Sequence, residues 1–182
     1  VEEMKGYKDI MKPSKLLGII SSFFLRKPIL VTWQCTYLCN LRCKMCSYWK
    51  LKINPKEEMS VYDYEISAPK VAKLGVRFVS LSGGEPFLRK DLHKIIEALS
   101  KYFFVAITSN GVSITRKMAR KVARSGVSSV FVSLDFVSPE KHDEQRGSKG
   151  AYDEVMKSLE ILREELYPGQ TVGIMTVLSS RN

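Results

Sequence analysis

The sequence lacks a disulfide framework and a long hydrophobic run. Its four cysteines all lie within residues 35–46 of a 182-residue chain, and such crowding indicates metal or redox chemistry in a reducing compartment. The most apolar stretch, residues 16–25, is interrupted by small polar residues and is shorter than the roughly 20 residues that a membrane span needs. No small-residue cleavage site of a signal peptide accompanies it. We therefore expect a cytoplasmic protein.

A long basic tract is also missing, although the net charge is +10. The lysines and arginines are scattered along the chain, which argues against nucleic-acid binding. Histidine is scarce: His93 and His142 are the only two, and we interpret both as surface or loop residues. The length and a hydrophobic content of 45% are sufficient for one domain with a substantial core.

The first 27 residues predict a separate basic and apolar helical segment. Leucine, isoleucine and phenylalanine recur in residues 14–27, next to Lys15, Arg26 and Lys27. One interpretation is an amphipathic helix that lies on a membrane surface and gives peripheral membrane contact. The interpretation that we favour is a helix that closes one end of the domain.

Strands and helices alternate through the remainder of the chain. Apolar and β-branched runs predict five strands, at residues 29–35, 78–82, 103–109, 129–135 and 171–178. Helical periodicity and capping signals predict helices at residues 60–74, 91–101, 115–125 and 152–166. The first of these should bend near Pro69, and a polar loop through Arg146 should precede the last.

This alternation predicts an α/β fold. Middle strands recur about every 26 residues, as right-handed βα units in a parallel sheet require. The sheet can be open or closed into a barrel, and a barrel that ends after the fifth strand would be partial or truncated. Polar clusters follow the strands, so they should gather at the carboxyl edge, where such folds place their chemistry.

Cys39, Cys43 and Cys46 form a Cys-x3-Cys-x2-Cys run directly after the first strand. Three thiolates this close together can hold an iron–sulfur cluster, zinc or copper(I). A structural zinc ion would need a fourth ligand, whereas Cys35 belongs to the strand and is interpreted as a buried apolar residue. Three ligands on a 4Fe-4S cube leave one iron open for chemistry.

Two motifs together resemble those of the radical S-adenosylmethionine (radical SAM) superfamily. Cys39, Cys43, Met45 and Cys46 match its cysteine signature, and Gly83-Gly84-Glu85-Pro86 matches its Gly-Gly-Glu-Pro motif after the second strand. The resemblance covers residues 28–182 and implies a radical SAM core barrel, a partial (β/α)6 TIM-like barrel. The order of Ser133, Asp135, His142 and Arg146 is most similar to the group that includes molybdenum cofactor biosynthesis, haem-maturation and peptide-modifying enzymes.

The resemblance also implies the cofactors. A 4Fe-4S cluster would be bound by Cys39, Cys43 and Cys46, and S-adenosylmethionine would chelate the fourth iron. Reductive cleavage would then give a 5′-deoxyadenosyl radical that abstracts hydrogen from an unidentified substrate. A reductant such as flavodoxin or ferredoxin would be a partner. The protein itself would orient the cofactor and exclude water.

Eight residues are implied to bind S-adenosylmethionine. Gly83, Gly84 and Glu85 would meet the methionyl amino group, Met45 would pack near adenine, Ser133 and Arg146 would bind the ribose and the methionyl carboxylate, and Asn110 and Asp135 would touch ribose or substrate. Simpler roles compete with four of these assignments. Met45 can anchor its loop, Arg146 can be a solvated cation, Asn110 can form a turn, and Asp135 can cap the next loop.

Two other classes of protein remain open from the sequence. One is a zinc-knuckle protein that binds nucleic acid through its basic surface. The other is a degenerate barrel that keeps an iron–sulfur cluster only as an electron carrier or structural element.

Overall fold

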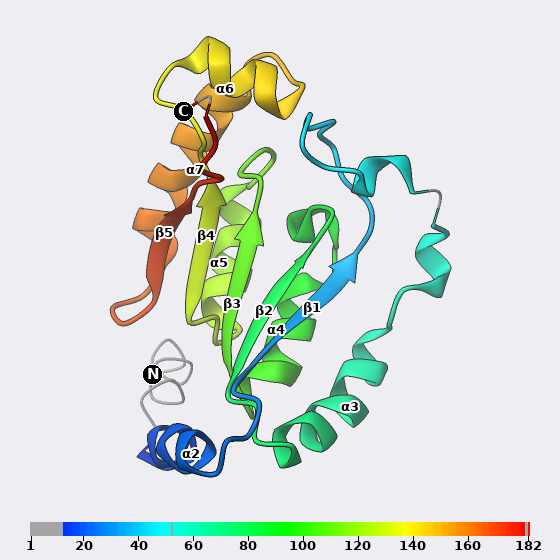
Figure 1. Ribbon diagram of the computed structural model, residues 1–182, viewed down its shortest axis with the longest axis vertical. Coiled ribbons are helices and arrows are strands. Elements are labelled where there is room, and N and C mark those ends of the chain that lie inside the picture. Colours follow the sequence, from blue (N-terminus) through cyan, green and yellow to red (C-terminus); the bar gives the residue numbers. More distant parts are fainter. Residues whose placement is uncertain (1–12, 52, 181) are drawn as a thin grey trace.

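The computed structural model describes residues 13–51, 53–180 and 182. Five parallel strands form one sheet in the order β1-β2-β3-β4-β5 (Figure 1). Their bounds are β1 Leu30–Thr36, β2 Phe78–Gly83, β3 Phe104–Ser109, β4 Ser129–Ser133 and β5 Thr171–Met175. All four pairings between neighbours are parallel. The predicted α/β class and parallel sheet are confirmed, and the open sheet corresponds to a partial barrel with β1 and β5 as its edges.

Four helices line up along one side of the sheet, and each packs against the next. These are α3 Val61–Lys73, α4 Leu92–Ser100, α5 Arg116–Arg124 and α7 Ala151–Glu165. Two further helices lie at opposite ends of the strands (Figure 1): α6 Pro139–Arg146 at the carboxyl ends and α2 Pro13–Phe24 at the amino ends. Three short 3-10 turns, Tyr48–Lys50, Pro55–Glu57 and Pro86–Leu88, complete the connections. None of the described helices is long and apolar enough to cross a membrane.

Alternate residues of the strands build the core between the sheet and these helices. In β2, β3 and β4 every second side chain is buried, which leaves the opposite face of the sheet more open. The buried members are Val79, Leu81, Val105, Ile107, Val130 and Val132, and they pack with Leu92, Ile95, Ile96 and Leu99 of α4. The packed face fixes the register of the sheet, and therefore the positions of the residues at its carboxyl edge.

Local signals explain where the helices begin. Ser60 and Asp63 form a capping box at the start of α3, in which each side chain accepts a bond from the other residue's backbone N–H. Thr115 caps α5 in the same sense by accepting from the Met118 N–H. Pro69 lies inside α3 and does not end it.

Two predictions for residues 136–150 were wrong. The expected polar loop contains α6, because Ser138 caps the helix, Pro139 occupies its first turn and Gly147 ends it with a φ of 65°. His142 lies on α6 and is fully buried instead of being a surface or loop residue.

Strands β4 and β5 also end before the predicted residues 135 and 178. The predicted N-terminal helical segment is present from Pro13 onward, and its residues 1–12 lie outside the described residues.

Candidate cluster and cofactor site

The three cysteines of the motif lie in the loop that follows β1, at the carboxyl edge of the sheet. All are free thiols: Cys43 is buried, and Cys39 and Cys46 are half-buried. A tight turn joins the last two, because the Cys46 N–H donates to the Cys43 carbonyl over 3.1 Å. Cys35 is different. It is buried in β1, and burial raises the pKa of its thiol to about 12, as expected for a core residue that stays protonated.

Gly84 and Glu85 bind the start of this cysteine loop through the backbone. The Gly84 N–H donates to the Thr36 carbonyl and the Glu85 N–H to the Leu38 carbonyl, both over 2.7 Å. A Cβ on Gly84 would lie 2.0 Å from the Leu38 oxygen, so only glycine allows this close approach. The Gly-Gly-Glu-Pro motif therefore holds the cysteine loop in place.

Glu85 joins the ends of β2 and β3. Its side chain is fully buried, and its carboxylate accepts hydrogen bonds from the Asn110 N–H at 2.7 Å, the Ser109 hydroxyl at 2.8 Å and the Phe87 N–H at 2.9 Å. Burial raises the pKa of Glu85 to about 7, and the three hydrogen bonds oppose that rise. The carboxylate is thus committed to the protein, and a contact with a methionyl amino group stays a prediction.

Asn110 reaches from the end of β3 to the cysteine loop. Its side-chain amide donates to the Asn40 side-chain oxygen at 2.8 Å and lies 3.8 Å from the Cys39 sulfur. Its own oxygen accepts from the Val112 N–H, so Asn110 also forms the turn that competed with a binding role. Asn40 in turn donates to the Val112 carbonyl and the Ser113 hydroxyl. Sequence reasoning missed Asn40, although it stands directly after Cys39.

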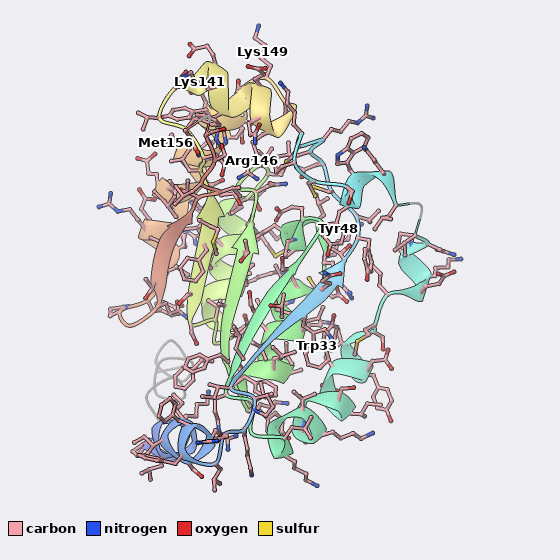
Figure 2. The ribbon with its side chains drawn as sticks, viewed as in Figure 1. Trp33, Tyr48, Lys141, Arg146, Lys149 and Met156 are labelled. Carbon is pink, nitrogen blue, oxygen red and sulfur yellow. The ribbon has the colours of Figure 1, made fainter. Side chains whose placement is uncertain are left out.

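Arg146 is buried between α6 and the sheet, so it is not a solvated cation (Figure 2). Its guanidinium pairs with the Asp135 carboxylate at 2.7 Å and lies 4.0 Å from the Cys43 sulfur. His142 supports this pair, because its Nδ1 accepts from the Asp135 N–H at 3.3 Å. Since Nδ1 is the acceptor, neutral His142 carries its proton on Nε2. Asp135 and Arg146, which the sequence predicts separately as site residues, therefore form an ion pair, and Arg146 brings it to Cys43.

The end of α6 binds the middle of the cysteine loop. The Lys44 N–H donates to the Gln145 carbonyl at 2.9 Å. Gly147 lies so close to the loop that a Cβ there would be 2.5 Å from the Arg42 carbonyl oxygen. This second attachment was missed together with α6, and the Ser-Pro at its start and the Arg-Gly at its end were the available signals.

The remaining predicted residues lie at the margin of the site. Ser133 is the last residue of β4 and is buried at the carboxyl edge. Met45 is exposed, and its sulfur lies 3.8 Å from the Gln145 side-chain nitrogen. Met45 is therefore open to solvent and touches α6, and its role as a cofactor contact or as a loop anchor stays a prediction.

Arg89 and Glu58, which no motif indicated, fix the end of β1. Arg89 donates to the Cys35 carbonyl at 2.7 Å and is held by both carboxylate oxygens of Asp91. Glu58 accepts from the Thr36 hydroxyl and the Tyr37 N–H, at 2.8 and 2.9 Å. The strand that presents the cysteines is therefore supported by charged hydrogen bonds at its exit.

The donor set fits an iron–sulfur cluster. Burial raises the pKa of Cys39 and Cys43, but an N–H group opposes this at each sulfur: the Leu41 backbone at Cys39 and Arg146 at Cys43. Donors of this kind stabilise the thiolates that ligate iron. Within the described residues, no three Cys, His, Asp or Glu side chains are placed to hold a single metal ion. A 4Fe-4S cube takes each of its protein ligands at a separate corner, and the soft sulfur donors of the cysteine loop suit it.

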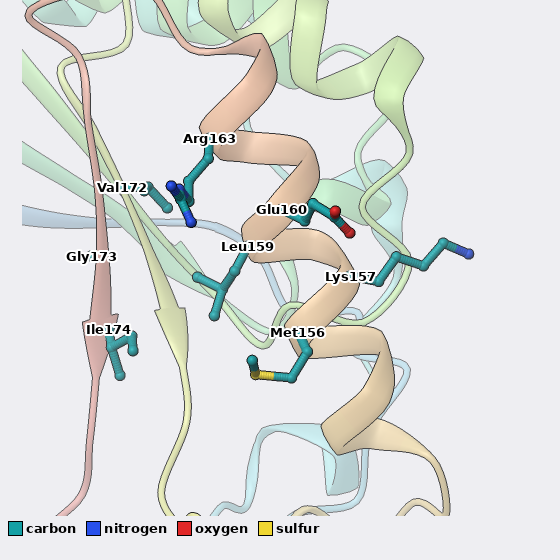
Figure 3. A pocket seen from close by; sticks show the side chains of 8 residues that line it. All are labelled: Met156, Lys157, Leu159, Glu160, Arg163, Val172, Gly173 and Ile174. Carbon is teal, nitrogen blue, oxygen red and sulfur yellow. The ribbon is translucent and has the colours of Figure 1, made fainter.

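A groove of about 620 Å³ lies elsewhere, between α7 and β5 (Figure 3). Met156, Leu159 and Ile174 give it apolar walls, and Lys157, Glu160 and Arg163 supply its charge. It contains none of the predicted site residues. The chemistry-bearing side chains of the sequence motifs are at the carboxyl edge.

The fold and this edge define a partial α/β barrel with a three-cysteine cluster site. Residues 33–182 match the model of the Radical SAM superfamily. The chain therefore belongs to the radical SAM superfamily, whose members bind a 4Fe-4S cluster and S-adenosylmethionine.

Named relatives agree with this assignment. The chain is 35% identical over 93% of its length to an Fe-coproporphyrin III synthase and 32% identical over 85% to an AdoMet-dependent heme synthase, both from Methanosarcina barkeri. It spans less than half of these relatives, 41% and 44% of their lengths. The names agree with the predicted resemblance to haem-maturation enzymes.

Solved structures confirm the fold. SuiB from Streptococcus suis, bound to S-adenosylmethionine, superposes with a TM-score of 0.72 at 21% identity, over 86% of this chain and 35% of SuiB. SuiB bound to its precursor peptide SuiA gives a TM-score of 0.71 at 20% identity, over 92% of this chain and 37% of SuiB. At this identity the likeness shows the fold alone.

Proposed function

We propose that this chain is the catalytic core of a radical SAM enzyme. Cys39, Cys43 and Cys46 would hold a 4Fe-4S cluster, which when reduced supplies cleavage of S-adenosylmethionine to a 5′-deoxyadenosyl radical for hydrogen abstraction from substrate. The observation that carries the proposal is the attachment of the cysteine loop. The Gly-Gly-Glu-Pro motif binds it on one side and the end of α6 on the other, so both family motifs meet at one edge.

The surrounding residues would bind and orient S-adenosylmethionine. The backbone at Gly83 and Gly84 would meet the methionyl amino group. Arg146 would bind the methionyl carboxylate, since a guanidinium matches carboxylate geometry, and it already holds the Asp135 carboxylate. The other predicted contacts, by Met45, Asn110 and Ser133, line the same edge.

The proposed partners follow from the chemistry. A one-electron donor such as flavodoxin or ferredoxin would reduce the cluster, and the substrate is unidentified. Four free cysteines suit a reducing compartment, so we place the reaction in the cytoplasm.

Anaerobic reconstitution with iron and sulfide tests the proposal. The expected result is about four irons per chain, the broad visible absorbance of a 4Fe-4S cluster, and 5′-deoxyadenosine after addition of S-adenosylmethionine and dithionite. Cys43→Ala should lose both iron and product. Cys35→Ala is the matched control, since it removes a buried thiol outside the motif, and it should retain both.

Three outcomes would contradict the proposal. A colourless protein that contains zinc and no iron would indicate a zinc-binding protein. An intact cluster that forms no 5′-deoxyadenosine under strong reductant would indicate an electron carrier. Product formation by Cys43→Ala would overturn the assignment of that ligand.

A further inference from the structure

Helix α2 has its polar side against the protein and its apolar side toward solvent. Three residues spaced at three and four positions face the domain. The Lys15 ammonium donates to the carbonyls of Ser100 and Phe103, Gly18 lies against the Arg77 side chain, and the Ser22 hydroxyl donates to the Gly75 carbonyl. These contacts attach α2 to the amino end of the sheet, as the interpretation of a closing helix requires.

The opposite side of α2 is apolar and exposed. Leu17 and Phe24 keep 65% and 78% of their residue surface open to solvent, and Ile20, Phe23 and Leu25 are also exposed. A surface helix of a globular protein ordinarily turns its apolar stripe toward the core. A contiguous group of large exposed hydrophobic residues marks an interaction surface.

Positive charge borders this apolar side. Arg26 and Lys27 follow α2 after Leu25 and are exposed. The last turn of α3 carries Lys70 and Lys73. It lies close to the end of α2, because Ser22 of α2 donates a hydrogen bond to Gly75, two residues after α3. Residues 10–56 and 66–84 contain no aspartate or glutamate. Helix α2 with the residues that follow it, and the end of α3, therefore carry positive charge alone.

We call this surface the basal face; it consists of the exposed side chains of Leu17, Ile20, Phe23, Phe24 and Leu25 together with Arg26, Lys27, Lys70 and Lys73. We propose that the basal face docks on an anionic phospholipid bilayer. Large apolar side chains bordered by lysine and arginine are the combination that binds such interfaces.

The location of the basal face suits this role. In Figure 1, α2 and the end of α3 lie side by side at the amino ends of the strands, and the cysteine loop and α6 lie at the carboxyl ends. A bilayer on the basal face would leave the cluster site open. The two interpretations of residues 14–27 then describe two sides of one helix, one closing the domain and one meeting lipid.

Vesicle sedimentation with the purified protein tests the proposal. We expect binding to vesicles of phosphatidylglycerol and phosphatidylcholine, weaker binding to pure phosphatidylcholine, and loss of binding at high salt. Leu17→Ser with Phe24→Ser should lower the partition coefficient at least about tenfold, because two large side chains no longer leave water. Arg26→Glu with Lys27→Glu should remove the preference for anionic vesicles.

Val137→Ser is the matched control, since Val137 is 89% exposed but follows β4 at the carboxyl edge. It should bind vesicles like the unsubstituted protein. Circular dichroism and thermal unfolding establish that each variant is folded. Cluster content and S-adenosylmethionine cleavage should be unchanged in the basal-face variants, so this proposal and the proposed function fail independently.

Three results would overturn membrane docking. Absence of vesicle binding would mean that other parts of the protein cover the basal face or that it stays in water. Equal binding to neutral and anionic vesicles would remove the role of charge. A dimer in analytical ultracentrifugation that Leu17→Ser with Phe24→Ser dissociates would assign the basal face to a second copy of the chain.

Discussion

The Glu85 carboxylate accepts a hydrogen bond from the Asn110 backbone N–H at 2.7 Å, which joins the loop after β2 to the loop after β3. Both residues also contact the cysteine loop, Glu85 through its N–H to Leu38 and Asn110 through its amide to Asn40. The Gly-Gly-Glu-Pro motif therefore has a structural role that holds before any cofactor binds. It fixes the cysteine loop against two neighbouring strands.

Substitution of Gly84 tests this role. Gly84→Ala should lower the free energy of unfolding by more than about 3 kcal/mol, because the new Cβ overlaps the backbone of Leu38 and neither can move freely. Gly18→Ala is the control. Its Cβ meets only the flexible end of Arg77 and alanine favours the helix, so the change should stay within about 1 kcal/mol. Urea unfolding of both variants measures the difference, and equal costs would contradict the steric explanation.

Removing one partner of the buried pair of Asp135 and Arg146 should destabilise the protein more than replacing both partners. Asp135→Asn should cost about 3–5 kcal/mol, because it leaves the buried guanidinium without its countercharge. Combining it with Arg146→Met should recover part of that loss. The control is Glu144→Gln in the solvent-exposed pair with Lys44, which should cost less than about 1 kcal/mol. Denaturant unfolding of the unsubstituted protein, of Asp135→Asn, of Arg146→Met and of the double variant gives the coupling energy. Simple additivity would argue against a buried ion pair.

The raised pKa of Glu85 should make the stability of the protein depend on pH. Its pKa is about 7 in the folded protein against an ordinary value of 4.5, so between these values the folded state binds more protons than the unfolded state. The contribution of Glu85 to stability is thus greatest below pH 4.5 and falls by up to about 3 kcal/mol as the pH rises through 7.

Comparison with Glu85→Gln isolates this effect. Burial lowers the pKa of His142 and of His93, and these groups shift stability in the opposite direction, so the difference between the two proteins is the relevant quantity. Unfolding free energies from pH 4.5 to 8 should fall more steeply in the unsubstituted protein. Parallel curves would show that Glu85 is ionised throughout this range.

The hydrogen bonds of Asn40 should slow the release of iron from the site. Asn40→Ala removes hydrogen bonds to Asn110, Val112 and Ser113 and should speed iron release to a chelator severalfold, because the cysteine loop loses its attachment to the end of β3. Asn54→Ala is the control, since Asn54 caps a short 3-10 turn away from the cysteines. The rate of bleaching of the reconstituted protein is the measurement. Equal release rates would leave Asn40 without a role in retention.

Sequence patterns predicted most of the sheet and its helices, because strand alternation and helix caps are local signals. The Ser60 cap and the buried run in β3 are examples. Residues 139–146 were harder, since α6 is strongly polar and buries only His142 and Arg146. A helix with so narrow a buried face has almost no hydrophobic periodicity to detect.

The motifs located the site but not the contacts that build it. Spacing identified Cys39, Cys43 and Cys46, whereas the roles of Asn40, Arg89 and Glu58 depend on residues that are distant in sequence. The buried state of Arg146 depends likewise on its pairing across the fold with Asp135. Such long-range polar contacts leave no periodic trace in a single sequence.

The attachments of the cysteine loop should allow the chain to fold before metal is inserted. Backbone hydrogen bonds from Gly84, Glu85 and Lys44 hold the loop with protein atoms alone. Zinc fingers behave in the opposite way, because their ligands come together only when the ion binds. An apoprotein with this loop should therefore fold first and present an assembled receptor to whichever scaffold delivers iron and sulfide, and its loss of cluster to oxygen should be repairable without refolding.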